Sequence, residues 1–465
     1  MFSPSTYADR RRRLFKADAL DRGLVLLLGN TQSPMNYEDN PYPFRQDSTF
    51  LYYVGIDTPG SAALLDVESG STCLYGTDPS LDDVIWMGER PSQADYAEAA
   101  GIPDTADWPT LTSDISAALD SGRPIHFLPP YRPGHKLQLA RLLDLNPAQV
   151  SDRASTPLCR TVVEHRSRKE SVEVDQLETA VNVTARMHRH ALRTARPGTT
   201  ERTVAGTLAG LADAHGTGLS FRPTCSVHGE VLHNHEYDNT LESGDLLLVD
   251  AGAASPLHYA GDITRVAPVS GTFTPQQRAV YDAVLDAQVS AIDAIQPDRT
   301  FRDIHLHACT VLTEHLIDIG LMKGDASAAV QAGAHALFLP HGLGHMLGLD
   351  AHDMENLGED LVGYAPDQSR SDQFGLHTLR LARPLAPGFV VTVEPGCYFI
   401  PALIERWASE RRHAEFIDYD TVEDFVGLGG IRIEDDVLVT EEGGRVLGPG
   451  IPKAPDAVEE LASAG

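Results

Sequence analysis

Residues 246–252 read LLLVDAG, and this stretch sets the fold class of the larger part of the chain. A run of apolar residues this dense is typical of a strand that is buried on both faces. A carboxylate at the end of such a strand, here Asp250, costs free energy unless it has a partner. A second strand-like stretch, YAGDITR at residues 259–265, follows after a hairpin-length gap. Because strand side chains alternate, it places Asp262 and Thr264 on one face.

Three later segments also hold ionisable residues among apolar ones. They are HGLGH at residues 341–345 with another histidine at position 352, VVTVEPG at 390–396, and GIRIEDD at 430–436. In the last segment, alternation places Arg432 and Glu434 on one face of a strand. The first segment is not the HExxH motif of zinc peptidases, because Gly342 follows His341. Each signal is weak alone, since a strand-end aspartate is usually a cap or turn former.

Together the segments supply four carboxylates, Asp250, Asp262, Glu394 and Glu434, and the imidazole of His345. These groups cannot share one core without a cation. Oxygen-rich ligands with a single imidazole suit Mn²⁺ or a similar borderline-hard ion. The carboxylates outnumber what one ion needs, so the pattern predicts two metals, an arrangement that suits hydrolysis.

The composition narrows the class of partner. The chain has 465 residues, 42% of them hydrophobic, which indicates a globular protein. Lys and Arg number 37 against 66 Asp and Glu, a net charge of −29, so nucleic acid and anionic membranes are not expected partners. No apolar run approaches membrane-spanning length. The five scattered cysteines, without a CxxC pair, predict reduced thiols in a cytoplasm.

The pattern along the chain predicts a domain boundary near residue 163, giving domains 1–163 and 164–465. Alternating helix and strand patterns in the first predict a self-contained α/β domain. There we expect strands at 24–28, 50–55 and 62–67 and helices at 7–20, 92–101 and 132–144. In the second we expect one helix from 164 to about 196, helices at 200–215, 275–295 and 301–320, strands at 245–250, 261–268, 389–394 and 430–439, and a mobile tail from Pro449. Short gaps between several strands predict a mixed or antiparallel sheet.

The five segments, in this order and with these gaps, resemble the pita-bread metallopeptidases, the group of aminopeptidase P, prolidase, methionine aminopeptidase and creatinase. PYPFRQ at residues 41–46 and FLYY at 50–53 resemble the N-terminal domain of aminopeptidase P and prolidase, which methionine aminopeptidase lacks. Creatinase keeps the fold without the metal ligands, whereas all five positions are filled here. The resemblance implies an α/β (α+β) chain with a pita-bread catalytic domain, a curved mixed or antiparallel sheet flanked by helices, and a homodimer or homotetramer.

The same resemblance implies a role for each metal ligand. Asp262 and Glu434 would bridge two divalent ions, Mn²⁺, Co²⁺ or Zn²⁺, while Asp250 would complete one ion and His345 with Glu394 the other. A hydroxide bridging the metals would attack the scissile carbonyl of an Xaa-Pro bond, and Glu394 would carry its proton.

Further residues around the metals also receive roles from the resemblance. His352 would donate to the developing oxyanion and His233 and His341 would position the substrate. Tyr398 and Arg432 match active-site positions of the family, and Thr264 would support them. The sequence assigns no role to His235.

Two features favour a dipeptidase over an aminopeptidase. Residues 375–385, GLHTLRLARPL, resemble a prolidase stretch whose arginine, here Arg380, holds the free carboxylate of an Xaa-Pro dipeptide. The insertion of roughly 30 residues between Tyr398 and Gly429 also resembles prolidase. The expected enzyme is therefore an Xaa-Pro dipeptidase acting on proline-containing dipeptides or short peptides. The alternatives are Xaa-Pro aminopeptidase, or aminopeptidase P, and, more remotely, a non-catalytic peptide- or protein-binding protein on the same fold.

Overall fold

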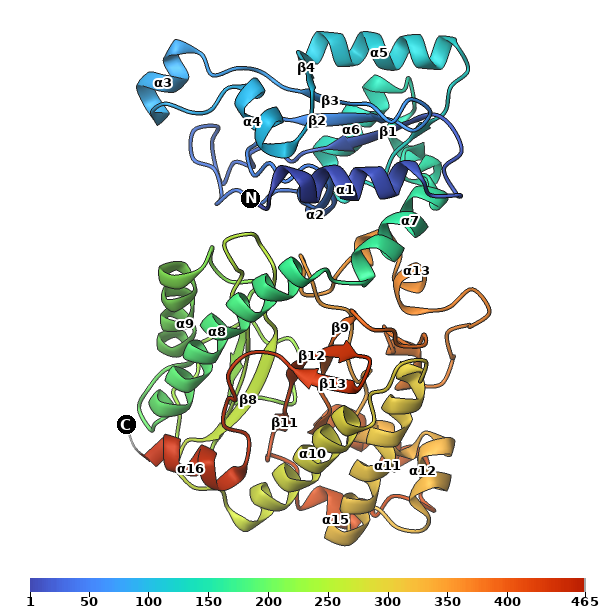
Figure 1. The fold of residues 1–465 in the computed structure, drawn as a ribbon. Coiled ribbons are helices and arrows are strands. Elements are labelled where there is room, and N and C mark those ends of the chain that lie inside the picture. Colours follow the sequence, from blue (N-terminus) through green and yellow to red (C-terminus); the bar gives the residue numbers. More distant parts are fainter. Residues whose placement is uncertain (464–465) are drawn as a thin grey trace. The chain divides into compact units, whose positions relative to one another are not determined.

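The computed structural model describes residues 1–463, which separate into two compact units (Figure 1). The N-terminal unit comprises Met1–Arg166 with Glu355–Leu361. The second unit comprises Ser167–Met354 and the described chain from Val362 to Ser463, and it is called the catalytic unit because it holds the five ionisable segments for which catalysis is expected. Both units mix helices with strands, so the expected fold class is confirmed. The position 163, where the sequence pattern changes, lies inside a helix, α7 (Thr156–Ser167).

The N-terminal unit is built on a five-stranded mixed sheet with the order β4-β3-β2-β1-β5. β1 pairs antiparallel with β2 and parallel with β5, and β3 pairs antiparallel with β2 and parallel with β4. Its strands are β1 (Leu24–Leu28), β2 (Ala62–Asp66), β3 (Thr72–Tyr75), β4 (Asp104–Ala106) and β5 (Ile125–His126). Its helices before α7 are α1 (Pro4–Phe15), α2 (Ser48–Tyr53), α3 (Leu81–Met87), α4 (Gln93–Ala100), α5 (Trp108–Asp120) and α6 (Pro133–Leu142).

The aromatic stretch at residues 50–55 was expected as a strand, and the structure shows that this is wrong. Residues 50–53 belong to helix α2, which begins after Asp47 and ends before Val54. The Asp47 side chain accepts a hydrogen bond from the Phe50 amide at 2.9 Å. All six residues of α2 are buried. A short helix with no exposed face has no polar–apolar period, so its sequence cannot be distinguished from that of a buried strand.

The catalytic unit contains three small antiparallel sheets surrounded by helices. The strands are β6 (Thr224–Ser226), β7 (Leu246–Ala251), β8 (Ile263–Pro268), β9 (Val390–Val393), β10 (Gly396–Tyr398), β11 (Gly430–Arg432), β12 (Asp435–Thr440) and β13 (Gly443–Val446). The main helices are α8 (Ser171–Thr194), α9 (Glu201–His215), α10 (Pro275–Asp293), α11 (Phe301–Ile319), α12 (Ala326–Ala332), α14 (Pro401–Glu410), α15 (Tyr419–Glu423) and α16 (Pro455–Ser463). A short helix, α13 (Glu359–Gly363), contains the point at which the chain leaves the N-terminal unit, after Leu361, and returns to the catalytic unit at Val362.

Two expectations for this part of the chain are corrected. The single helix expected from residue 164 is divided, because α7 ends at Ser167 and α8 starts after Glu170, which forms a capping box with Glu173. The chain after Pro449 is not simply a mobile tail, because it forms α16, which packs on α8 and buries Val458 and Ala462.

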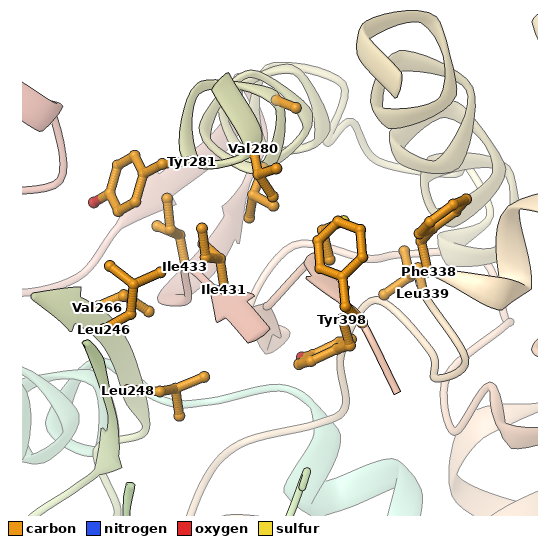
Figure 2. Packing of buried hydrophobic residues seen from close by; sticks show 14 of the residues in the cluster. Leu246, Leu248, Val266, Val280, Tyr281, Phe338, Leu339, Tyr398, Ile431 and Ile433 are labelled. Atoms are coloured by element: carbon orange, nitrogen blue, oxygen red, sulfur yellow. The ribbon is translucent and has the colours of Figure 1, made fainter. Parts of the chain in front are cut away.

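The core of the catalytic unit fixes the strands that carry the ionisable residues. Figure 2 shows Leu246 and Val266, from β7 and β8, packed with Ile431 and Ile433 beneath Val280 and Tyr281 of α10. Burying an aliphatic side chain of this size contributes about 1.5–3 kcal/mol. Because strand side chains alternate, anchoring these apolar residues also fixes the direction of the polar residues between them.

Within residues 1–463, no helix is both long and apolar enough to cross a membrane. All five cysteines lie in this range as free thiols.

Candidate metal centre

The β7–β8 hairpin places the first two carboxylates. In its register Asp250 of β7 lies opposite Thr264 of β8, and Asp262 directly precedes β8. The Asp262 amide donates to the Asp436 carboxylate at 3.0 Å. The segment between β11 and β12 joins this hairpin, because the Glu434 amide donates to the Thr264 carbonyl oxygen at 3.2 Å. Two parts of the chain that are distant in the sequence therefore meet at one place.

Three potential ligands converge where these segments meet. One ligand atom each of Asp262, His345 and Glu434 lies within 4.8 Å of the other two, and all three residues are buried. The His345 Nε2 atom is 3.4 Å from Asp262 Oδ2 and 3.7 Å from Glu394 Oε1. His345 Nδ1 donates to the Met346 carbonyl at 3.0 Å, which directs Nε2 toward the carboxylates. Burial alone would lower the pKa of His345, but Asp262 and Glu394 raise it to about 9.

Arg432 orients the residues beside this cluster. Its guanidinium donates to Asp250 Oδ2 at 2.6 Å, to the Tyr398 hydroxyl at 3.0 Å and to Thr264 Oγ1 at 3.1 Å. The Thr264 hydroxyl donates in turn to Glu434 Oε2 at 2.6 Å. Arginine suits this role because its planar fork can serve several acceptors in fixed directions.

Tyr398 continues the network to His341. The two side chains are 2.8 Å apart at the tyrosine hydroxyl and Nε2. Nδ1 of His341 donates to the Gly342 carbonyl at 2.7 Å, so Nε2 is the acceptor of the tyrosine proton when the imidazole is neutral. Burial, together with the charge of Arg432, lowers the pKa of His341 to about 3, which keeps the ring neutral.

The carboxylates in the cluster carry more negative charge than Arg432 can balance. Burial raises the pKa of Asp250 to about 7, since the nearby Asp262 and Glu394 oppose the effect of Arg432. Burial and the neighbouring carboxylates also raise the pKa of Glu394 and, strongly, that of Glu434. Among the described residues, the buried Oδ1 atom of Asp250 has no hydrogen-bond partner. This donor set fits divalent cations, which would neutralise the excess charge and occupy the unpaired oxygen.

The cluster lies at a cavity of about 380 Å³. Of the other predicted site residues, His233, His341, His352, Arg380 and Arg432 line this cavity. The His352 ring stacks on that of His345, with the centroids 3.8 Å apart and the planes at 15°. Thr264 and Tyr398 contact the cluster through the hydrogen bonds of Arg432. The structure thus brings together every site residue that the sequence predicted.

Sequence reasoning gave no role to several residues that contribute to the site. The Thr392 hydroxyl accepts from the His345 amide at 3.1 Å and lies 3.4 Å from Glu394 Oε1. Strand alternation could have identified Thr392, two positions before Glu394, and Asp436, two positions after Glu434. Phe221 and Arg222 also line the cavity, as does His235. They carry no motif, because their proximity depends on the path of the loops.

A buried carboxylate–histidine cluster beside a peptide-sized cavity is the arrangement that a metal-dependent hydrolase requires. The profile described as metallopeptidase family M24 matches residues 175–441, and that of the aminopeptidase P N-terminal domain matches residues 7–126. The chain belongs to metallopeptidase family M24. It is accordingly a metallo-exopeptidase that uses divalent metal ions.

Individual relatives and solved structures agree with this assignment. The chain is 31% identical to the Xaa-Pro dipeptidase of Homo sapiens, over 97% of this chain and 90% of the relative. It is 30% identical to a probable Xaa-Pro aminopeptidase of Aspergillus fumigatus, over 95% and 92%. The structure of the Pseudomonas aeruginosa aminopeptidase PepP is similar with a TM-score of 0.82 and 28% identity, covering 100% of this chain and 98% of that one. The expected two-part aminopeptidase-like fold is confirmed.

Proposed function

We propose that this metallopeptidase is an Xaa-Pro dipeptidase, with proline-containing dipeptides as its substrates. The observation that carries this proposal is the position of Arg380, which lines the same cavity as the carboxylate–histidine cluster. Its guanidinium is a bidentate partner for the free carboxylate of a dipeptide. A cavity of about 380 Å³ suits a small ligand of this kind.

The metal ligands would be the residues of the cluster. Asp250, Asp262, His345, Glu394 and Glu434 would together hold two divalent ions. Mn²⁺ is the proposed native ion, because four carboxylates and one imidazole form an oxygen-rich set. When bound, such ions polarise a carbonyl and promote ionisation of water at neutral pH.

The remaining residues would position the substrate and move protons. Glu394, held near Thr392, would accept a proton from water and deliver it to the leaving proline nitrogen. His352 would donate to the developing oxyanion. Burial lowers the pKa of His233, with Arg432, His235 and Arg380 adding to the effect. A neutral His233 could then donate a hydrogen bond to the substrate without adding charge.

An Xaa-Pro aminopeptidase, also called aminopeptidase P, is the second candidate. It is favoured by the fungal relatives and by the similarity to solved aminopeptidase P structures at TM-scores of about 0.8. An aminopeptidase must leave room beyond the proline for the rest of a longer peptide. In that case Arg380 would belong to the wall of the cavity and would not hold a substrate carboxylate.

Two properties of the whole molecule are also proposed. The first is assembly into a homodimer or homotetramer, as implied by the resemblance to prolidase and aminopeptidase P. The second is a cytoplasmic location, since the five cysteines are free thiols.

The decisive experiment compares Ala-Pro with Ala-Pro-Ala as substrates for chelator-stripped protein reloaded with Mn²⁺. A dipeptidase should prefer Ala-Pro, and Arg380→Ala should raise its KM for Ala-Pro by roughly 10- to 100-fold, the value of a hydrogen bond to a charged group. The matched control is Arg383→Ala, since the Arg383 guanidinium packs against the Phe389 ring at 5.2 Å. A preference for Ala-Pro-Ala that is unchanged in Arg380→Ala would identify an aminopeptidase instead.

A further inference from the structure

A second group of potential metal ligands lies in the catalytic unit, outside the lining of the substrate cavity. It consists of His305 and Cys309 from α11 and His335 from the short 3₁₀ helix at residues 334–337. All three side chains are fully buried, each with an exposed fraction of 0%. One ligand atom of each residue lies within 4.8 Å of the other two. This cluster contains no carboxylate, in contrast to the group around Asp262.

The local fold explains why the three side chains meet. His305 and Cys309 are four residues apart on one face of α11, and the Cys309 sulfur is 3.6 Å from the nearer ring nitrogen of His305. His335 follows Gly333, whose left-handed φ of +87° ends α12 and turns the chain back toward α11. The rings of His305 and His335 are 6.5 Å apart. The cluster thus joins a helix to a separate segment.

His335 is the feature that points to a ligand. Within residues 1–463, neither of its ring nitrogens has a hydrogen-bond partner, although the side chain is fully buried. Buried imidazoles almost always have at least one hydrogen-bond partner, because an unpaired polar group in the core costs free energy. Burial lowers the pKa of His305 to about 3 and that of His335 to about 4. Both rings are therefore neutral, and each has a nitrogen lone pair to donate.

We propose that His305, Cys309 and His335 form a second metal site, which binds a thiophilic cation, Zn²⁺ or Cu⁺. A thiolate with two imidazoles is a softer donor set than carboxylates and favours these ions over Mn²⁺. Binding forms a metal–sulfur bond, breaks the S–H bond of Cys309 and releases its proton to solvent. With Cu⁺ the resulting centre is electrically neutral, and with Zn²⁺ it carries one positive charge. The apolar surroundings therefore favour Cu⁺.

The consequence of this site is structural. The metal would tie α11 to residues 334–337, which lead directly into the segment of His341 and His345. Occupancy would therefore raise the melting temperature and leave the preference among peptide substrates unchanged. This proposal does not depend on the dipeptidase assignment.

The test uses the full-length chain with Co²⁺ as a probe, supplied during expression because the cluster is closed to solvent. A cysteine–cobalt bond gives a sulfur-to-metal charge-transfer band that the oxygen and imidazole ligands of the catalytic centre cannot produce. We expect this band in the wild-type chain. The Cys309→Ala variant should lose both the band and one equivalent of bound metal. The matched control is Cys225→Ala, since Cys225 is equally buried, its thiol donates to the Glu201 carbonyl at 3.7 Å, and it belongs to neither group of potential metal ligands among residues 1–463.

Two further measurements complete the test. His335→Gln should also lose one equivalent, which covers the case in which Cys309→Ala does not fold. For Cu⁺, protein expressed with copper under reducing conditions should keep one equivalent against a Cu⁺-selective chelator. If the protein retains Cu⁺ and shows no cobalt band, the site is a copper site. If the protein shows the cobalt band and retains Zn²⁺, the site is a zinc site. If the wild-type chain shows neither the cobalt band nor retained Cu⁺, the proposal is wrong, whatever the peptidase assays give.

Discussion

Arg432 and Arg265 are both buried beside an aspartate, yet the two ion pairs differ in charge balance. Arg432 contacts Asp250 at 2.6 Å and Arg265 contacts Asp435 at 2.5 Å. Lys453 also binds Asp435, at 2.6 Å, and the Gln288 amide donates to it at 2.9 Å. Burial alone would raise the pKa of Asp435, but Arg265 and Lys453 lower it to about 2. The pKa of Asp250 is raised to about 7.

The difference shows how a buried charge is used in each place. Around Asp435 the two cations, Arg265 and Lys453, outnumber the carboxylate. The charge of Asp435 is therefore balanced by protein groups alone, and its role is structural. Around Asp250 the carboxylates are in excess, which destabilises the protein until cations bind. The two networks lie on opposite sides of the same strands, because neighbours such as Thr264 and Arg265, or Glu434 and Asp435, point in opposite directions.

The largest expected effect concerns the cluster around Asp250, where the carboxylates are in excess. Glu434→Gln keeps the shape of the side chain and an oxygen to accept the Thr264 hydrogen bond, but removes the charge that would bind metal. We expect kcat/KM to fall by about 10³-fold or more, since a metal supplies several kcal/mol of transition-state stabilisation. Glu441→Gln, at an exposed position of the β12–β13 turn, is the control and should keep full activity. Normal activity of Glu434→Gln would contradict the assigned ligand set.

The second largest effect concerns Asp435 and its two cationic partners, Arg265 and Lys453. Asp435→Asn leaves Arg265 and Lys453 without a carboxylate, and breaking a buried pair in this way costs about 3–5 kcal/mol. The melting temperature should fall clearly. Asp238→Asn, which removes the exposed partner of Arg202, should leave it nearly unchanged, because water screens that pair. Equal shifts in the two variants would show that burial does not distinguish these ion pairs.

A smaller effect, present only in acid, involves His188, which is buried behind the strand of Asp250. Its Nε2 is 3.0 Å from the Ala251 carbonyl oxygen, and burial lowers its pKa from 6.5 to about 4. His188 binds a proton more readily in the unfolded chain than in the folded chain. It therefore does not change the free energy of unfolding above pH 6.5. As the pH falls from 6.5 toward 4, the free energy of unfolding decreases by about 3 kcal/mol at most.

This pH dependence can be measured as the free energy of unfolding between pH 7 and pH 4. His188→Gln should reduce the loss of stability over that interval, whereas His190→Gln, on the same helix but half-buried, should not. If both variants lose stability with pH as the wild type does, His188 does not control the acid sensitivity.

Much of the catalytic unit could be predicted because its signals are local. The dense apolar run before Asp250 defines a buried strand, and alternation places Glu434 beside Arg432. The expected strand at residues 50–55 was wrong because all six residues of α2 are buried, which removes the period that distinguishes helix from strand. The helix expected to continue through residues 168–170 is interrupted, since Glu170 caps a new one.

The sequence by itself determined which ionisable residues lie on buried strands, because alternation and apolar runs depend only on neighbouring residues. Only the tertiary structure decided which of those residues meet. Asp262 and Glu434 are far apart in the chain and become neighbours through a backbone contact at Thr264. The grouping of His335 with His305 and Cys309 also depends on a turn at Gly333 and on helix packing. Such contacts follow from the packing of the whole core, which no local pattern records.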